Sequence, residues 1–208
     1  IQLLLKAAVL NNDARIEKVK GEKRYTIFGS PTESSLLVLA AKAAVFKESF
    51  SVQRIEEIPF SSTRKMMSIL ASDGIVYVKG APEAILPHCT RIQKGQDSFP
   101  LGENEKIEIA QAMNSLVQQA YRTIALAYKP HGNDKNYQES DLVFIGLVGI
   151  EDPPREEVKE AIKTSLAAGI AVKMITGDNP QTAQAIASQI GLTGGMLEGK
   201  KLDTLSDK

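Results

Sequence analysis

The chain is poor in the residues that build several common kinds of site. Its 208 residues include no tryptophan, one cysteine (Cys89) and two histidines (His88 and His131). A single cysteine cannot form an internal disulfide, and so few thiol and imidazole groups argue against a zinc site or a catalytic triad. We therefore expect no metal ligated by the chain and a reducing compartment.

Net charge and long apolar runs are also lacking. Twenty-five basic and 25 acidic residues cancel, so bulk charge favours neither nucleic acid nor an anionic membrane surface as partner. The longest apolar run, residues 142–150, is less than half of the roughly twenty residues that span a bilayer, and we interpret it as a buried strand. Ile1 opens the chain within a helical pattern, without an initiator methionine or signal peptide, so we expect part of a larger protein.

Residues 1–140 have an α+β pattern. Ser30-Pro31-Thr32-Glu33 fits a helix start, with Ser30 as N-cap, Pro31 as first helical residue and Glu33 completing a capping box. Two β-rich runs around Asp73-Gly74 predict a hairpin. Further expected elements are helices within 1–10, 80–89 and 103–121, a strand over 123–128, and polar loops over 91–102 and 129–140.

The pattern changes near residue 140. A strand over 142–150 is followed by a helix to residue 168, a strand over 171–176 and a helix over 180–190. Strands that alternate with helices are typical of crossover units in a parallel sheet. We therefore expect an α+β domain, an antiparallel sheet with flanking helices, over 1–140, and part of an α/β domain over 141–208.

The segment VKMITGDNPQTA places a hydroxyl and a helix start at the end of an apolar strand. Thr176 ends the expected strand, Gly177 permits a tight turn, and Asn179-Pro180 fits an N-cap and first helical residue. Exposed amide donors at a helix start can hold a phosphoryl group. The same residues can equally build a plain strand-to-helix turn, and spacing does not decide between the two.

Three further side chains have both a functional and a structural interpretation. Lys79 ends a strand beside Gly80, where it either meets a nucleotide or is simply solvated. Phe60 either stacks on a purine or belongs to the core. Glu33 is already explained by the capping box.

Taken in order, the segments GSPTESSL, PFSSTRKMMS, VKGAPEAIL, RTIALAY, EDPPR and MITGDNPQTA resemble the successive signatures of P-type cation-transporting ATPases. The resemblance covers nearly the whole chain. It implies a nucleotide-binding domain over residues 1–140 and a partial phosphorylation domain, haloacid-dehalogenase-like, over 141–208.

The resemblance also assigns roles to matching positions. Phe60 would stack on adenine, Lys79 would lie deep against the purine, and Glu33 would lie near its amino edge. Arg122 would approach the phosphates. Lys65 and Gly80 also match residues of the family's ATP pocket. Asp152 and Arg155 match residues at the hinge between the two domains. Thr176, Gly177 and Asp178 match the segment that holds the transferred phosphoryl group.

Two signatures of the family are absent from the chain. Neither DKTGT, with the phosphorylated aspartate, nor TGDGxND, with magnesium-binding aspartates, occurs in it. The resemblance therefore implies a chain that binds ATP or ADP but cannot form the aspartyl-phosphate. In the full-length protein it implies ATP and Mg²⁺ as cofactors. The implied partners are the rest of the phosphorylation domain, an actuator domain and transmembrane helices, with the chain on the cytoplasmic side and no nucleic acid bound.

The transported ion and the function class leave alternatives. PFSSTRKMMS together with KGAPEAIL resembles the calcium-pump branch, although sodium-potassium pumps share KGAPE. One competing hypothesis is a haloacid-dehalogenase-like soluble phosphatase with a large cap domain. Another is a nucleotide-binding module that works alone.

Overall fold

The computed structural model describes residues 1–18, 25–132, 137–151, 154–177 and 180–202. The chain divides into two compact units, one formed by residues 1–109 and 123–150 and the other by residues 110–122 and 151–208. Each unit is described by itself. The first contains the large sheet and most of the residues singled out above.

Among the described residues, seven strands form one sheet in the order β3-β4-β5-β8-β9-β6-β7. Antiparallel pairing joins β3–β4, β4–β5, β5–β8 and β6–β7, and β6 pairs with β9 in parallel. The mixed α/β class with a mainly antiparallel sheet agrees with the expectation for this part of the chain. The strand bounds are β3 (Arg54–Ile58), β4 (Met66–Ala71), β5 (Ile75–Gly80), β6 (Cys89–Lys94), β7 (Asp97–Pro100), β8 (Arg122–Pro130) and β9 (Leu142–Ile150).

The β4–β5 hairpin confirms the turn expected at Asp73-Gly74. Gly74 has a φ of 74°, in the left-handed region that glycine adopts without a Cβ penalty. The Asp73 carboxylate accepts a hydrogen bond from the Ile75 amide at 3.3 Å, as Asx turns do. The register that follows places Met67 opposite Lys79.

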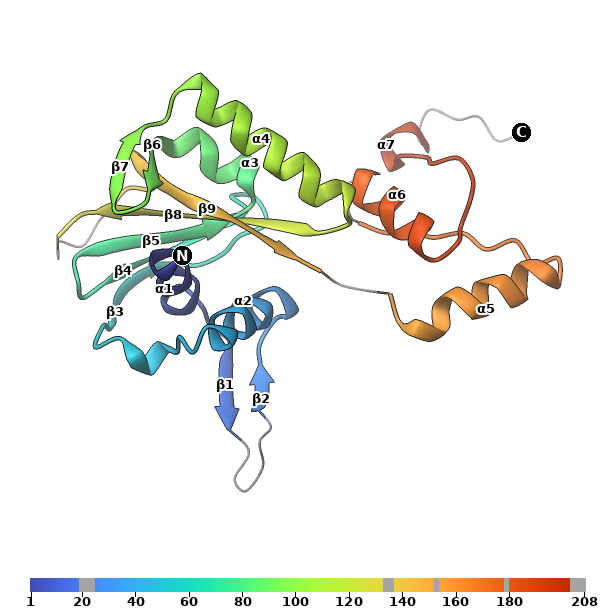
Figure 1. Cartoon of the computed structure of the whole chain (residues 1–208), viewed down its shortest axis with the longest axis horizontal. Helices are drawn as coiled ribbons and strands as arrows, with labels where there is room; N and C mark the ends of the chain where they lie inside the picture. Colours follow the sequence, from blue (N-terminus) through green and yellow to red (C-terminus); the bar gives the residue numbers. More distant parts are fainter. Residues whose placement is uncertain (19–24, 133–136, 152–153, 178–179, 203–208) are drawn as a thin grey trace. The chain divides into compact units, whose positions relative to one another are not determined.

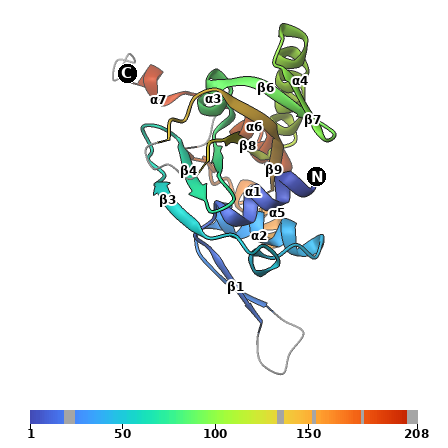
Figure 2. The same ribbon diagram turned by 90° about the vertical axis from the view of Figure 1, so that its left-hand side faces the viewer.

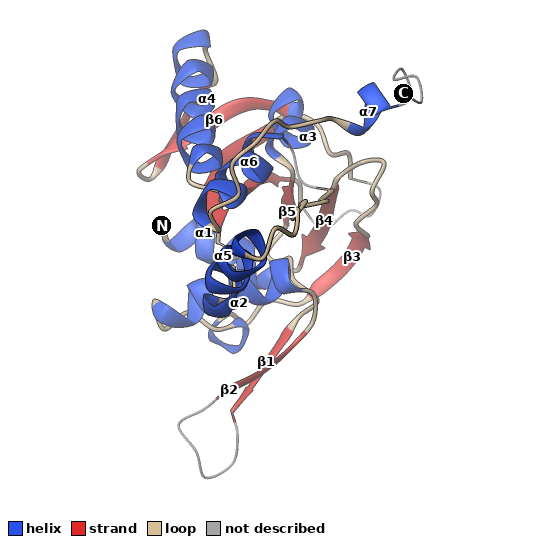
Figure 3. Cartoon of the chain, turned by 90° about the vertical axis from the view of Figure 1, so that its right-hand side faces the viewer, coloured by secondary structure: helices blue, strands red, loops and turns tan. Residues whose placement is uncertain are grey.

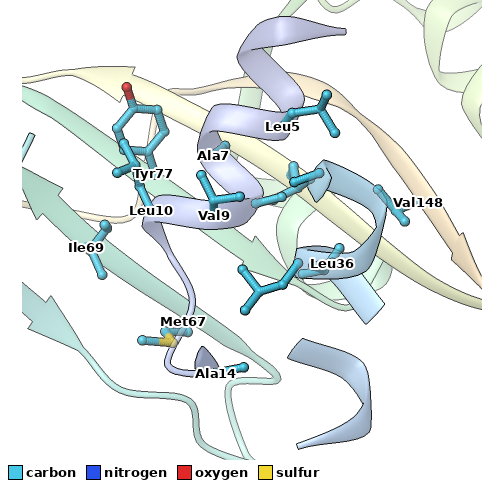
Figure 4. Packing of buried hydrophobic residues seen from close by; sticks show 14 of the residues in the cluster. Leu5, Ala7, Val9, Leu10, Ala14, Leu36, Met67, Ile69, Tyr77 and Val148 are labelled. Atoms are coloured by element: carbon cyan, nitrogen blue, oxygen red, sulfur yellow. The ribbon is translucent and has the colours of Figure 1, made fainter. Parts of the chain in front are cut away.

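Two helices, α1 (Gln2–Leu10) and α2 (Pro31–Lys42), pack on the sheet through one buried core (Figures 1 and 4). Ala7 and Ala8 of α1 are fully buried, and their small side chains allow the helix to approach the strands closely. Burial of each large core side chain, such as Leu36 or Tyr77, contributes about 1.5–3 kcal/mol. This core fixes the start of α2 against the end of β5.

A separate two-stranded ribbon, β1 (Arg15–Lys18) with β2 (Tyr25–Phe28), lies between the two helices in sequence and extends away from the sheet (Figure 2). The sequence pattern did not predict it. Short elements complete the first unit: the 3₁₀ turns η1 (Lys47–Ser49) and η2 (Leu86–His88) and the helix α3 (Pro82–Ile85).

The prediction of a polar loop over residues 91–102 was wrong. The β6–β7 hairpin occupies residues 89–100, and its strands pair from Arg91–Pro100 to Lys94–Asp97. Most of its side chains are exposed or half-buried, so the sequence lacks the apolar alternation by which half-buried strands are recognised.

The prediction of a strand over residues 171–176 was also wrong. These residues have no regular secondary structure and are drawn as loop before α6 (Figure 3). Ile175 among them is 97% exposed. A strand needs a neighbour that satisfies its backbone groups, and β9, the expected neighbour, pairs within the large sheet instead. The helices expected over 103–121, up to residue 168 and over 180–190 do form, as α4 (Glu103–Gln118), α5 (Glu156–Ala167) and α6 (Pro180–Gln189), and α4 spans the division between the units. The short helix α7 (Gly199–Leu202) was not predicted. An α/β haloacid-dehalogenase-like domain is not confirmed.

Cys89 offers a test of this packing. Its thiol donates to the Ile85 carbonyl at 3.4 Å, and burial raises its pKa to about 12. We expect iodoacetamide to label the native chain at pH 8 at least about a hundredfold more slowly than the urea-unfolded chain, because the thiolate is the nucleophile. Free cysteine is the reference, and equal labelling rates before and after unfolding would contradict the buried position.

Candidate functional site

An ion pair joins the start of α2 to the end of β5. Glu33 donates its amide to Ser30 Oγ at 3.3 Å, which confirms Ser30 as the N-cap. The Glu33 carboxylate instead accepts from Lys79 Nζ at 2.5 Å and from the Asp13 amide at 3.3 Å. The helix cap therefore involves only the backbone amide of Glu33, whereas its carboxylate forms an ion pair with Lys79.

Lys79 is not the solvated strand-end lysine that was its alternative interpretation. The residue is only 8% exposed, although lysine is rarely buried without a partner. Burial lowers the pKa of Lys79, and the carboxylates of Glu33 and Asp13 oppose that shift. The ammonium group thus depends on one close carboxylate for compensation.

Gly80 follows Lys79 at a point where two backbones touch. A Cβ added at Gly80 would collide with the Lys65 carbonyl and lie 2.6 Å from Met66 Cβ. The same Lys65 carbonyl accepts a hydrogen bond from the Ala81 amide at 2.9 Å. A residue with a side chain cannot fit here without moving the start of β4.

Lys65 lies at the end of the loop of residues 59–65 that connects β3 to β4. Its φ of 54° is in the left-handed region, which is uncommon for a residue with a side chain. Its ammonium group is 3.0 Å from Glu83, and both side chains are more than half exposed. Partial burial acts to raise the pKa of Glu83, but the hydrogen bond and charge of Lys65, together with a hydrogen bond to the backbone amide of Glu83 itself, outweigh it and the pKa is lowered.

Phe60 lies in the same loop and does not belong to the core. The residue is 61% exposed, whereas Met66 and Met67, just beyond the loop, are buried. A ring this exposed contributes little to the core, and its exposed surface is suited to stacking on a flat ligand. The core alternative for Phe60 was therefore wrong.

Five of the singled-out residues, Glu33, Phe60, Lys65, Lys79 and Gly80, lie in the first unit. The second unit contains a further set and is described apart from them: Arg122, Arg155, Thr176 and Gly177. Thr176 and Gly177 are exposed and precede α6, which begins at Pro180 as expected. Asp152 and Asp178 lie outside the described residues, so their roles stay predictions.

Asn11 and Asn12 were missed as parts of this site. The side-chain amide of Asn11 donates to the backbone carbonyls of Met67 and Tyr77, each at 3.1 Å, and so connects the end of α1 to the two strands of the hairpin. The side-chain amide of Asn12 donates to the backbone carbonyl of Glu33 at 3.0 Å. Both asparagines are at most 1% exposed. The only signal in the sequence was three polar residues after an apolar helix, which also marks an ordinary helix end.

Two open cavities lie beside β1 and are not lined by Phe60 or Lys79. One, of about 410 Å³, has Asp13, Arg15 and Arg54 in its lining, and the other, of about 420 Å³, is bordered by Glu17 and Phe28. Phe60 and the Glu33–Lys79 pair thus lie outside both cavities.

Comparison with known proteins places this architecture in a family. A profile described as "P-type ATPase, cytoplasmic domain N" matches residues 1–157. The chain is 40% identical over its whole length to a "Calcium-transporting ATPase" of Bacillus subtilis, of which it covers 24%. It is 34% identical over 99% of its length to the human "Calcium-transporting ATPase type 2C member 1", of which it covers 22%.

The matched region defines a domain of P-type ATPases. The chain belongs to the P-type ATPase family, which confirms the resemblance drawn from its motifs. It spans about a quarter of the length of these relatives. In the part of the chain that the structure describes, no helix is both long and apolar enough to cross a membrane.

Breaking the Glu33–Lys79 pair is expected to destabilise the first unit in a pH-dependent way. Glu33→Gln should lower the free energy of unfolding at pH 7 by about 1–3 kcal/mol, because it leaves a buried ammonium group without its carboxylate. The folded-state pKa of Lys79 is lowered, so between that value and the ordinary one the unfolded state binds more protons and stability rises with pH.

Urea unfolding of Glu33→Gln from pH 7 to pH 10 measures both effects, since part of the loss should be recovered at the alkaline end. Glu83→Gln is the matched control: it breaks the exposed pair with Lys65 and should cost less than about 1 kcal/mol. Equal losses for the two variants would show that the Glu33–Lys79 pair is not buried as described.

The close approach at Gly80 predicts a steric cost. Gly80→Ala should destabilise the chain by about 2–4 kcal/mol, because its Cβ meets backbone and Cβ atoms that cannot move independently. In Gly102→Ala the new Cβ meets only the flexible carboxylate end of Glu105, so we expect a loss below about 1 kcal/mol. Thermal unfolding that ranks Gly102→Ala as the more damaging change would refute the contact.

Proposed function

We propose that the chain is the adenine-nucleotide-binding part of a P-type ATPase that transports calcium. The observation that carries the proposal is the combination, in one unit, of the exposed ring of Phe60 with the buried Glu33–Lys79 pair. The two are connected through the backbone, because the loop that carries Phe60 ends at Lys65, which packs on Gly80.

The three side chains offer what a purine needs. The ring of Phe60 would stack on the base, an interaction worth about 1–3 kcal/mol. The Lys79 ammonium group can donate to a ring nitrogen, and the Glu33 carboxylate can accept from the exocyclic amino group. Because these two groups already satisfy each other in the free chain, a bound base would share an existing charge pair.

The remaining residues of the site are assigned on the same basis. Lys65 and Gly80 would complete the pocket, and Arg122 would approach the phosphates. Asp152 and Arg155 would act at the hinge between a nucleotide-binding domain, residues 1–140, and a partial phosphorylation domain, residues 141–208. Thr176, Gly177 and Asp178 would contact the transferred phosphoryl group.

In the full-length protein the γ-phosphoryl group of ATP would pass to an aspartate, releasing ADP, with Mg²⁺ spreading the charge that develops on the phosphoryl oxygens. The DKTGT signature that carries this aspartate is not in the chain. The chain would therefore supply nucleotide binding, while the aspartate and the metal-binding residues come from other segments of the pump.

Calcium as the transported ion rests on the names of the relatives, which are calcium-transporting ATPases of bacteria, plants and mammals. On the basis of the same family membership, the chain would lie on the cytoplasmic side of a membrane, next to actuator and transmembrane segments of the pump. The family match weighs against the haloacid-dehalogenase-like phosphatase.

Titration calorimetry with ADP tests the site. Phe60→Ala should raise the dissociation constant for ADP by about 5- to 100-fold, the range of one lost stacking contact. Phe99→Ala is the control, because Phe99 is also exposed, at 46%, but lies on β7 at the far edge of the sheet. Unchanged affinity in a folded Phe60→Ala chain would exclude stacking, and an equal loss in both variants would exclude a site at Phe60.

A further inference from the structure

The loop of residues 59–65, which carries Phe60, is held at both ends by one side chain. The guanidinium group of Arg64 donates to the Pro59 carbonyl at 2.5 Å and to the Met66 carbonyl at 3.2 Å. The Arg64 amide also donates to Ser61 Oγ at 3.1 Å. A planar guanidinium group with five donors suits such a role, because it can contact several acceptors in fixed directions.

The remaining contact of Arg64 reaches a carboxylate that is anchored in the sheet. Arg64 Nη1 is 2.5 Å from Glu139 Oε2, and the Glu139 side chain is only 11% exposed. The other carboxylate oxygen, Oε1, accepts from Ser68 Oγ at 2.5 Å. Ser68 is fully buried in β4 and is also 3.0 Å from the Tyr137 hydroxyl. The pair therefore connects the loop to a rigid strand.

The loop has a conformation that needs such support. Lys65, its last residue, has a φ of 54°, and side-chain-bearing residues persist in this region when their surroundings hold them there. The Lys65 amide donates to the Ser61 carbonyl at 2.7 Å, which closes the loop on itself. These hydrogen bonds hold the backbone on both sides of Phe60, whose side chain remains exposed.

We propose that Arg64 and Glu139 form a strut that orders the loop of residues 59–65 and thereby positions the ring of Phe60 for stacking on the purine. The inference rests on the function proposed above and assigns both as positioning residues, since Arg64 has its donors committed to Glu139, Pro59 and Met66. Loop order that exists before binding lowers the entropy lost when a ligand binds.

Glu139→Gln in the chain of residues 1–208 removes the charge of the strut with little change of shape. We expect the dissociation constant for ADP to rise by about 3- to 30-fold, which lies within the range of coupling energies between neighbouring residues. Added to Phe60→Ala, the same substitution should change affinity less than about twofold, because the ring it positions is gone. Glu105→Gln is the matched control: it breaks the Lys94–Glu105 pair, 3.0 Å long, away from the loop.

A second readout requires no nucleotide. The chain has five tyrosines but no tryptophan, so Phe60→Trp places a single tryptophan in the loop, and its fluorescence can be excited apart from that of the tyrosines. Glu139→Gln in that background should lower the fluorescence anisotropy that reports ring motion, and Glu105→Gln should not. Arg64→Lys keeps the positive charge but loses the planar fork, so it should reproduce the loss if Glu139→Gln fails to fold.

The strut is overturned if Glu139→Gln, or Arg64→Lys in its place, leaves both affinity and anisotropy unchanged. It is overturned equally if the substitution weakens ADP binding as much in the Phe60→Ala background as in the wild type. Different results would contradict the proposed function: the wild-type chain would not bind ADP, or the Phe60→Ala chain would bind ADP as tightly as the wild type. The anisotropy measurement would then still decide whether the strut orders the loop.

Discussion

The ion pair between Glu33 and Lys79 is the interaction on which the arrangement of the site depends. It connects the first turn of α2 to the C-terminal end of β5, and Lys79 is only 8% exposed. A buried charge of this kind is tolerated only with a close partner. The relative position of helix and strand is therefore set by electrostatics as well as by apolar packing.

Around this pair the chain combines a rigid base with an exposed contact surface. The sheet and the hydrogen bonds of Asn11 to both strands of the hairpin hold Lys79 in place. The loop of residues 59–65 packs on Gly80 and presents Phe60 to solvent. An exposed aromatic ring contributes little to the core of a domain, but its face is suited to the stacking proposed above.

Local rules in the sequence predicted the parts whose causes are local. The Ser30 cap and the Asp73-Gly74 hairpin depend on a few adjacent residues, and strand alternation placed Lys79 on the same face as Tyr77. The β6–β7 hairpin was not predicted, because its mostly exposed strands lack the alternation of apolar and polar residues that marks a half-buried strand. The strand expected over residues 171–176 depended on pairing with another strand, and no local pattern shows whether that neighbour is available.

The same reasoning explains which site residues could be found. Phe60 and Lys79 were singled out by residue type and position, but their exposure and burial were decided by contacts with residues far away in sequence. Asn11 and Arg64 act through side-chain bonds to backbone carbonyls, which leave no periodic signal.

The most direct test of the nucleotide site is a titration of the ¹⁵N-labelled chain with ADP, followed by NMR. The account predicts saturable shifts of the amide signals of Glu33, Phe60, Lys79 and Gly80. Saturable shifts confined to the cavity beside β1, at Arg15 and Glu17, with none at Phe60 or Lys79, would contradict it.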